Sequence, residues 1–132
     1  MSTYIGKVLI VEDEPHIAHF LRHRLSNLGF DVENAYSGRE ALETSDSFDP
    51  DAVVLDLELP DVSGLSICDR LRDRSPRAGK RRNKRGIVIV SAHIQDEETL
   101  PGSVEADACF PKPISTQILA SSIQELISEP GE

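Results

Sequence analysis

Short apolar runs alternate along this chain with longer segments whose apolar residues recur at helical spacing. Runs of the fully buried strand type lie at 7–11, 52–57 and 87–90, where almost every residue is apolar. Two weaker stretches, 31–36 and 108–110, also favour strands. The pattern therefore predicts five short strands separated by more polar segments.

Helical patterns fill most of the intervals between these strands. Pro15 can occupy the first turn of a helix that Gly29 is suited to end. Ser37 begins a capping box for a second helix, a third follows the turn at 59–64, and Ser115 can cap the last. The apolar residues expected on the first and last helices are Ile17, Phe20, Leu21, Leu25, Leu28, Ile118, Leu119, Ile123, Leu126 and Ile127.

The remaining segments are less regular. Residues 96–106 are expected to be only weakly helical, because a proline and a glycine interrupt them. Residues 75–86 are rich in Arg, Lys, Gly and Pro and are expected to form an exposed, basic inserted loop. The tail 129–132 should be loose. Since no linker is long enough to divide the chain, residues 1–132 are expected to form a single domain.

This order of elements predicts a fold class and the place of a site. Strands that alternate with helices form right-handed βαβ units, and so a parallel sheet with helices on both faces. Ligands on such sheets bind beyond the carboxyl ends of the strands. Polar residues stand at those ends, namely Glu12, Asp13, Asp56, Ser91 and Lys112.

These residue types together favour phosphoryl-transfer chemistry. Three carboxylates at one sheet edge repel each other, and a divalent cation or the Lys112 ammonium would relieve the repulsion. Mg²⁺ suits carboxylate oxygens, a carbonyl and retained waters. Asp56 would then be a nucleophile that forms an aspartyl phosphate, with Ser91 and Lys112 binding phosphoryl oxygens. Phosphoryl transfer depends mainly on such positioning and charge stabilisation.

Composition adds limits on compartment and cysteine chemistry. The chain is 39% hydrophobic and 28% charged, which is ordinary for a globular domain. No apolar run approaches the ~20 residues of a membrane span. The N-terminus lacks signal-peptide anatomy, so we expect a cytoplasmic protein without membrane contact. Cys68 and Cys109 match no disulfide framework or zinc motif and are expected to be buried as small apolar residues.

The net charge of -9 is unevenly distributed. From Arg70 to Arg85 the chain carries nine basic residues and one acid, and the remainder has a net charge of -17. An acidic protein without a wider basic surface is a poor candidate for direct nucleic-acid binding. The basic segment is expected to be a solvated loop. The alternatives are that it contacts an acidic partner or a phosphate backbone, and Arg81, Arg82, Lys84 and Arg85 would be the residues of a partner contact.

The motifs resemble, from end to end, the receiver domain of response regulators in two-component signalling. The matching pieces are VLIVEDE at 8–14, VVLDLELPDVSG at 53–64, IVIVSA at 87–92 and Lys112-Pro113. Each piece is weak alone, and all four in order are specific. The resemblance implies an α/β, flavodoxin-like fold: a doubly wound, five-stranded parallel sheet of order 2-1-3-4-5.

The resemblance also implies an acceptor and a metal. Carried over by position, Asp56 is the phosphoacceptor and Mg²⁺ is the cofactor. Asp13 resembles the direct Mg²⁺ ligand, and Glu12 the acidic neighbour that helps through water. Asp56 and the backbone carbonyl of Glu58 would be further ligands.

Other family positions surround the phosphoryl group. Ser91 resembles the hydroxyl residue that follows the phosphoryl group on activation, and Ala92 the small residue that leaves it accessible. Lys112 resembles the family's lysine, with a cis bond to the proline that follows. Glu58 and His93 occupy the two positions that tune how fast water removes the phosphoryl group.

One switch position departs from the family pattern. The family usually has Tyr or Phe three residues before the lysine, a ring that moves with the strand-four hydroxyl, here Ser91. This chain has Cys109 there, and Phe110 should face the other side of the strand. We therefore expect intact phosphorylation chemistry with an unusual output surface around the fourth and fifth strands.

The favoured interpretation is a stand-alone phosphorelay receiver. It would take a phosphoryl group from a sensor histidine kinase or histidine phosphotransfer protein onto Asp56, hydrolyse it slowly, and signal to a downstream protein by conformational change. This is self-phosphorylation and autodephosphorylation rather than turnover of a separate substrate. No output domain follows Glu132, so we expect the chain to act by docking to a partner, as an intermediate phosphoryl carrier, or as a fragment of a longer protein. Homodimer formation is left open.

Two other function classes are weighed against it. A degenerate receiver acting as a protein-binding module is supported by Cys109, but the complete set of acids, hydroxyl and lysine argues against it. A small Mg²⁺-dependent phosphohydrolase of the haloacid-dehalogenase type is suggested by Asp56-Leu57-Glu58. That family places its nucleophile on the first strand and has a second Asp two residues on, so it is the less favoured class.

Overall fold

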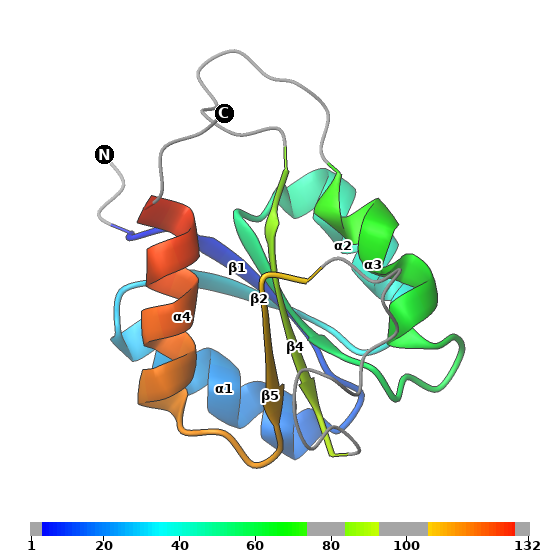
Figure 1. The fold of residues 1–132 in the computed structure, drawn as a ribbon, viewed down its shortest axis with the longest axis horizontal. Coiled ribbons are helices and arrows are strands. Elements are labelled where there is room, and N and C mark those ends of the chain that lie inside the picture. The colour runs from blue at the N-terminus through cyan, green and yellow to red at the C-terminus, as the bar shows by residue number, and fades with distance from the viewer. Residues whose placement is uncertain (1–3, 74–83, 93–105, 129–132) are drawn as a thin grey trace.

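The computed structural model describes residues 4–73, 84–92 and 106–128, which contain five strands and four helices. Figure 1 shows them as a sheet with helices on both sides. In chain order they are β1 (Lys7–Val11), α1 (Pro15–Asn27), β2 (Asp31–Ala35), α2 (Gly38–Phe48), β3 (Ala52–Asp56), α3 (Gly64–Arg72), β4 (Gly86–Ser91), β5 (Ala108–Pro111) and α4 (Thr116–Ser128).

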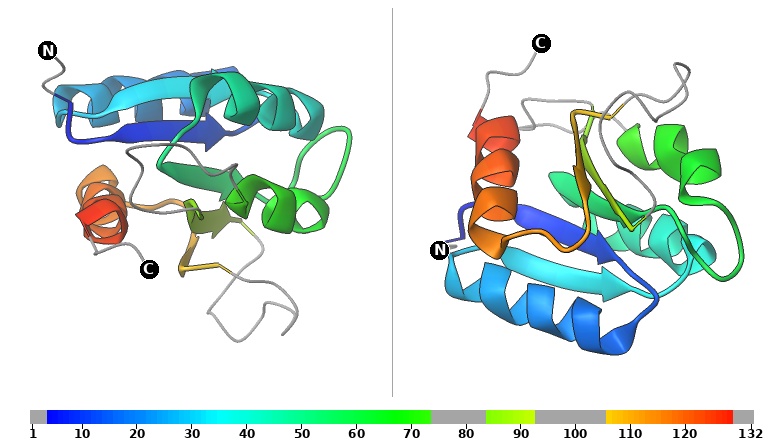
Figure 2. Two further views of the ribbon diagram at one scale, coloured as in Figure 1. Left: turned by 90° about the horizontal axis from the view of Figure 1, so that it is seen from above. Right: turned by 60° about the horizontal axis from the view of Figure 1, so that its bottom comes forward.

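The sheet is parallel throughout and has the order β2-β1-β3-β4-β5. This confirms the predicted doubly wound fold. Helices α1 and α4 lie on one face, and α2 and α3 on the other (Figures 1 and 2). The carboxyl ends of β1, β3, β4 and β5 are therefore neighbours along one edge of the sheet.

Burial on both faces explains why the strands are continuous apolar runs. In β1, Val8 and Ile10 join the core formed with α1 and α4, whereas Leu9 and Val11 join the core formed with α2 and α3. Successive side chains of a strand point to opposite faces, and here both faces are covered by helices. The apolar pattern thus follows from the layered architecture.

Local signals set most element ends as predicted. Pro15 opens α1, and Gly29, with a φ of 109°, follows its end in the left-handed region that favours glycine. Ser37 caps α2, its side chain accepting a hydrogen bond from the Glu40 N–H at 3.1 Å. The Oγ of Ser115 accepts from the Gln117 N–H at 3.2 Å at the start of α4. The predicted strands 31–36 and 52–57 each run one residue too far.

Some predicted residues are exposed, and some predictions lie outside the described residues. Ile17, Phe20 and Ile118 lie on α1 and α4 as expected, but their side chains are exposed, so the apolar faces of these helices extend beyond their core contacts. Residues 74–83, 93–105 and 129–132 are not described, and the predicted helix at 96–106 and the tail fall mainly there. Both cysteines are buried, as expected. Within the described ranges, no helix is long and apolar enough to cross a membrane.

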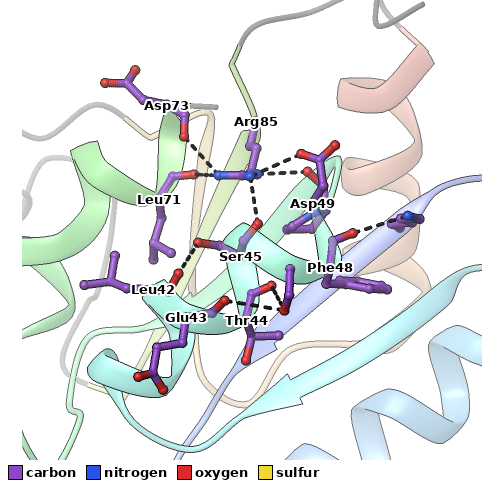
Figure 3. A network of polar contacts seen from close by, with 12 residues as sticks. Leu42, Glu43, Thr44, Ser45, Phe48, Asp49, Leu71, Asp73 and Arg85 are labelled. Atoms are coloured by element: carbon purple, nitrogen blue, oxygen red, sulfur yellow. Dashed lines mark hydrogen bonds and ion pairs between the residues drawn. The ribbon is translucent and has the colours of Figure 1, made fainter. Parts of the chain in front are cut away.

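The prediction of an exposed basic loop over 75–86 is wrong at its carboxyl end. Gly86 is the first residue of β4, and Arg85 has a relative exposure of only 4%. The Arg85 guanidinium forms an ion pair with Asp49 at 3.2 Å (Figure 3). It also donates to four backbone carbonyls, at distances of 2.9 to 3.1 Å, those of Ser45, Pro50, Leu71 and Asp73.

Candidate functional site

The polar residues predicted at the strand ends come together at the carboxyl edge of the sheet. Asp56 is the last residue of β3 and pairs in register with Val90, directly before Ser91 at the end of β4. Ser91 pairs with Pro111 of β5, which places Lys112 one residue beyond the sheet. Because β1 lies beside β3, Glu12 and Asp13 reach the same edge.

Three carboxylates form a cluster with the geometry of a metal site. Glu12, Asp13 and Asp56 each offer one oxygen, and these oxygens lie within 4.8 Å of one another. Glu12 and Asp56 are buried, whereas Asp13 is exposed. Hard carboxylate oxygens with one side open to solvent fit Mg²⁺, which binds through a few carboxylates and keeps several waters.

Lys112 compensates the negative charge of two of these acids. Its Nζ donates to Glu12 Oε1 at 2.6 Å and to Asp56 Oδ2 at 3.1 Å. Burial lowers the pKa of Lys112, but the hydrogen bonds to Glu12 and Asp56 outweigh burial and raise that pKa above its ordinary value. Burial raises the pKa of Glu12, despite the opposing hydrogen bond from Lys112. Lys112 is therefore a charged ammonium at neutral pH.

The position of Lys112 is set by the strand before it and the loop after it. Its backbone N–H donates to the Ser91 carbonyl at 3.0 Å, which continues the β4–β5 pairing by one residue. The Lys112-Pro113 peptide bond is cis, as the family resemblance implied. The hydrogen bonds of its ammonium show that the side chain runs across the ends of the strands, to Asp56 of β3 and to Glu12 directly after β1.

Glu58 connects the acceptor position to Ser91. The Glu58 backbone N–H donates to Asp56 Oδ1 at 3.1 Å, and Ser91 Oγ donates to Glu58 Oε2 at 2.7 Å. Ser91 is completely buried. The sequence assigned Glu58 a backbone-carbonyl and rate-tuning role and did not predict this side-chain contact. No local pattern signals it, because it depends on how the Glu58 side chain reaches from the loop after β3 to the end of the neighbouring strand β4.

The loop between β3 and α3 is fixed at both ends. The Gly64 N–H donates to the Leu57 carbonyl at 2.9 Å. In its middle, the Asp61 carboxylate accepts from the backbone N–H groups of Gly38 and Arg39, at 2.8 and 3.0 Å, at the start of α2. These backbone hydrogen bonds lower the pKa of Asp61. The loop that carries Glu58 is therefore docked on α2.

The other predicted positions have mixed outcomes. Ala92 directly follows β4 and is exposed, while His93 lies outside the described residues. Cys109 packs in the core on the α2 and α3 side, and Phe110 packs against the core on the α1 and α4 side. The expectation that these two neighbours face opposite sides is confirmed.

Comparison with known proteins finds similarity over most of the chain. The family model described as the response regulator receiver domain matches residues 8–124. The response regulator MprA of Mycolicibacterium vanbaalenii is 34% identical over 122 residues, which make up 92% of this chain and 50% of that protein. The chain thus spans about half the length of the curated relatives it matches first.

Solved structures resemble the fold over nearly the whole chain. A CheY-like receiver domain from Methylobacillus flagellatus has a TM-score of 0.74 at 31% identity, over 91% of this chain and 97% of that one. The response regulator TrrA from Thermotoga maritima, in complex with Mg²⁺-BeF, has a TM-score of 0.73 at 28% identity, with the same coverage. The similarity therefore extends well beyond the motifs around the site.

Proposed function

The chain belongs to the response regulator receiver domain family, and from this premise we propose that it accepts a phosphoryl group on Asp56. One observation carries the proposal. Asp56 ends β3 inside a cluster of three carboxylates whose oxygens lie within 4.8 Å, and its own carboxylate lies 3.1 Å from the Lys112 ammonium. A nucleophilic carboxylate beside a fixed cation and a Mg²⁺-type site is suited to take up a phosphoryl group.

Each residue has a defined part in the proposed transfer. An Asp56 carboxylate oxygen forms a bond to phosphorus, while the bond between phosphorus and the histidine nitrogen of the donor breaks. Lys112 offsets the added negative charge, and Ser91 donates a hydrogen bond to one phosphoryl oxygen. Glu12, Asp13, Asp56 and the Glu58 carbonyl would hold Mg²⁺, which supplies charge stabilisation to the phosphoryl oxygens when bound. The Mg²⁺-BeF complex of TrrA supports that choice of metal.

The proposed donor docks beside Lys112. A groove of about 540 Å³ opens there, lined by Lys112 and by apolar residues of α1, β4 and the loop before α4. The exposed side chains of Ile17 and Phe20 line it. Helix α1 contains arginines and histidines but no acid, in a chain of net charge -9. An acidic, amphipathic helix that carries the phosphohistidine of a kinase or phosphotransfer protein would fit this surface.

The first experiment is the intact mass of the chain after incubation with acetyl phosphate, with and without Mg²⁺. We expect one added phosphoryl group only with Mg²⁺, and none on Asp56→Asn. Asp46→Asn is the matched control, since it makes the same change on an exposed residue of α2 and should gain the group normally. A folded wild type that gains no mass, or an Asp56→Asn variant that gains the group, would refute the proposal.

The donor surface is tested separately with a panel of purified, phosphorylated sensor kinases. The kinase that phosphorylates the wild type fastest is then used on Phe20→Ala, which should accept the group roughly tenfold more slowly, as expected for an interface anchor. Leu28→Ala, also exposed but outside the groove, should behave as wild type. Labelling by acetyl phosphate should be unchanged in both. Equal transfer to all three chains would exclude this surface.

A further inference from the structure

The Ser91 hydroxyl already has a strong acceptor in the unphosphorylated chain. Its Oγ lies 2.7 Å from Glu58 Oε2, a short contact between a hydroxyl and a carboxylate. A hydroxyl carries one proton, so it can donate fully to only one acceptor at a time. If Ser91 is to donate to a phosphoryl oxygen, its bond to Glu58 must break.

The surroundings of Glu58 determine how that bond can break. Its backbone N–H is held by Asp56 Oδ1 at 3.1 Å, and the same loop is fixed to α2 through Asp61. The backbone therefore keeps Glu58 next to the acceptor position. The Glu58 side chain is exposed, whereas Ser91 is fully buried. When displaced, the carboxylate can rotate into water at little cost, but the Ser91 hydroxyl stays in the site.

We propose that Glu58 is a positioning residue that holds the Ser91 hydroxyl before phosphorylation and competes with the phosphoryl group for it. This inference rests on the proposed function of Asp56. The incoming group is negatively charged, so it both replaces Glu58 as acceptor and repels its carboxylate. Glu58 thereby opposes the phosphorylated arrangement and shifts the chain toward its resting state.

Beryllofluoride with Mg²⁺ is the probe, because it binds reversibly where a phosphoryl group would form a bond. Its affinity is measured by amide NMR titration for wild type, Glu58→Ala, Ser91→Ala and the double variant. We expect Glu58→Ala to bind roughly three- to tenfold more tightly, the size expected when one competing hydrogen bond of ordinary net strength is removed at a solvent-exposed side chain. In the Ser91→Ala background the same change should tighten binding clearly less, because only the charge repulsion of the Glu58 carboxylate is then removed. Glu43→Ala, an exposed acid of α2, is the matched control and should leave affinity unchanged.

A second measurement needs neither metal nor phosphoryl mimic. Urea unfolding of the same four chains without Mg²⁺ forms a double-mutant cycle, and the Glu58–Ser91 bond should couple the two changes by roughly threefold or more in the unfolding constant. This also shows whether each variant is folded. Glu58→Gln, whose amide oxygen still accepts but carries no charge, should fall between wild type and Glu58→Ala in beryllofluoride affinity.

The outcomes separate the two proposals. If the wild type binds beryllofluoride and Glu58→Ala binds equally or more weakly, the competition is refuted while the phosphoacceptor function stands. Equal tightening with and without Ser91 would show that charge repulsion acts alone, and would also overturn the role assigned to Ser91. A folded wild type that fails to bind beryllofluoride with Mg²⁺ would sink both proposals.

Discussion

Among the described residues, Lys112 supplies the positive charge that offsets the two buried carboxylates of the site. Its ammonium contacts two buried carboxylates, at 2.6 Å on Glu12 and at 3.1 Å on Asp56. Removing one partner from such a group leaves uncompensated charge away from water, which costs more than the intact interaction contributes. Within the described residues, Lys112 is therefore both a structural counter-charge and, in our proposal, the ligand of a phosphoryl oxygen.

This dual role predicts a Mg²⁺-dependent stability defect. Lys112→Met should lower the free energy of unfolding by about 2 kcal/mol without Mg²⁺, because Glu12 and Asp56 then repel each other. Added Mg²⁺ should restore part of that loss and should stabilise the variant more than the wild type. Urea unfolding at several Mg²⁺ concentrations measures both effects. Lys84→Met, which removes only an exposed ion pair with Asp73, serves as control and should respond to Mg²⁺ like the wild type.

Gly64 is required by close packing of the backbone at the acceptor. A Cβ atom there would lie 2.6 Å from the Asp56 carbonyl oxygen and 2.9 Å from Leu57 Cα. Both are main-chain atoms, so the end of β3 itself must shift. We expect Gly64→Ala to cost about 1–3 kcal/mol in urea unfolding, as overpacking does, and to slow acetyl phosphate labelling. At Gly86 the atoms nearest to an added Cβ belong to the Leu126 side chain, the closest at 3.1 Å, so Gly86→Ala should cost less in unfolding and leave labelling unchanged.

At the scale of elements, two polar contacts join neighbouring helices and strands. Asp61 fastens the β3–α3 loop to the start of α2. At the amino-terminal ends of the strands, Arg85 directly precedes β4 and its guanidinium binds the carboxyl ends of α2 and α3 (Figure 3). Carbonyls at helix carboxyl ends lack partners within the helix, and a guanidinium with five donors can satisfy several of them.

The Asp61 contact should make stability depend on pH in a defined window. Its pKa in the folded chain lies below the ordinary value of 3.8, because backbone N–H groups of Arg39 and Gly38 donate to the carboxylate. Its contribution is therefore complete above pH 3.8 and is lost as the pH falls through the lower, folded pKa. Urea unfolding of wild type and Asp61→Asn should differ at neutral pH and converge in strong acid. A difference that grows on acidification would contradict this assignment.

The Arg85 contact predicts a large difference between two adjacent basic residues. Arg85→Ala should lower the free energy of unfolding by about 3–5 kcal/mol, because it removes the cation that pairs with the buried Asp49 and the donor to four backbone carbonyls. Arg85→Lys should recover only part of that free energy, because a lysine ammonium cannot donate to the same set of carbonyl and carboxylate oxygens. Lys84→Ala should change stability by less than about 1 kcal/mol. Chemical denaturation of the three variants tests this, and equal effects at both positions would be inconsistent with it.

At the scale of the whole molecule, the sequence predicted the elements that have a regular apolar pattern. It did not predict polar contacts between residues that lie far apart along the chain. Parallel strands that are buried on both faces must be apolar throughout, so β1, β3 and β4 were visible as runs, and their ends located Asp56 and Ser91. Arg85 lies at the end of a basic stretch that the sequence predicts to be exposed to solvent. Its burial arises from carbonyls contributed by α2 and α3, far away in the sequence.

The candidate site divides in the same way. Family motifs and strand ends placed the acids and Lys112 without any knowledge of side-chain contacts. The Glu58–Ser91 bond and the Asp61 contact with α2 were not predictable, because both depend on the path of one loop after β3. The position of a residue at a strand end thus predicts that it lies near the other strand ends. The hydrogen-bond partner of its side chain depends on the conformation of the loop after β3.

The order of the strands also affects how readily the chain would aggregate at high concentration. Among the five described strands, β2 and β5 are the outer ones, and a strand from another molecule would have to pair with one of these two to extend the sheet. β2 carries Asp31 and Glu33, and β5 is four residues long and ends at Pro111, which has no N–H to donate. Charge, shortness and proline are features that discourage edge-to-edge aggregation. Continuation of the sheet by a strand from a second copy of this chain is therefore disfavoured.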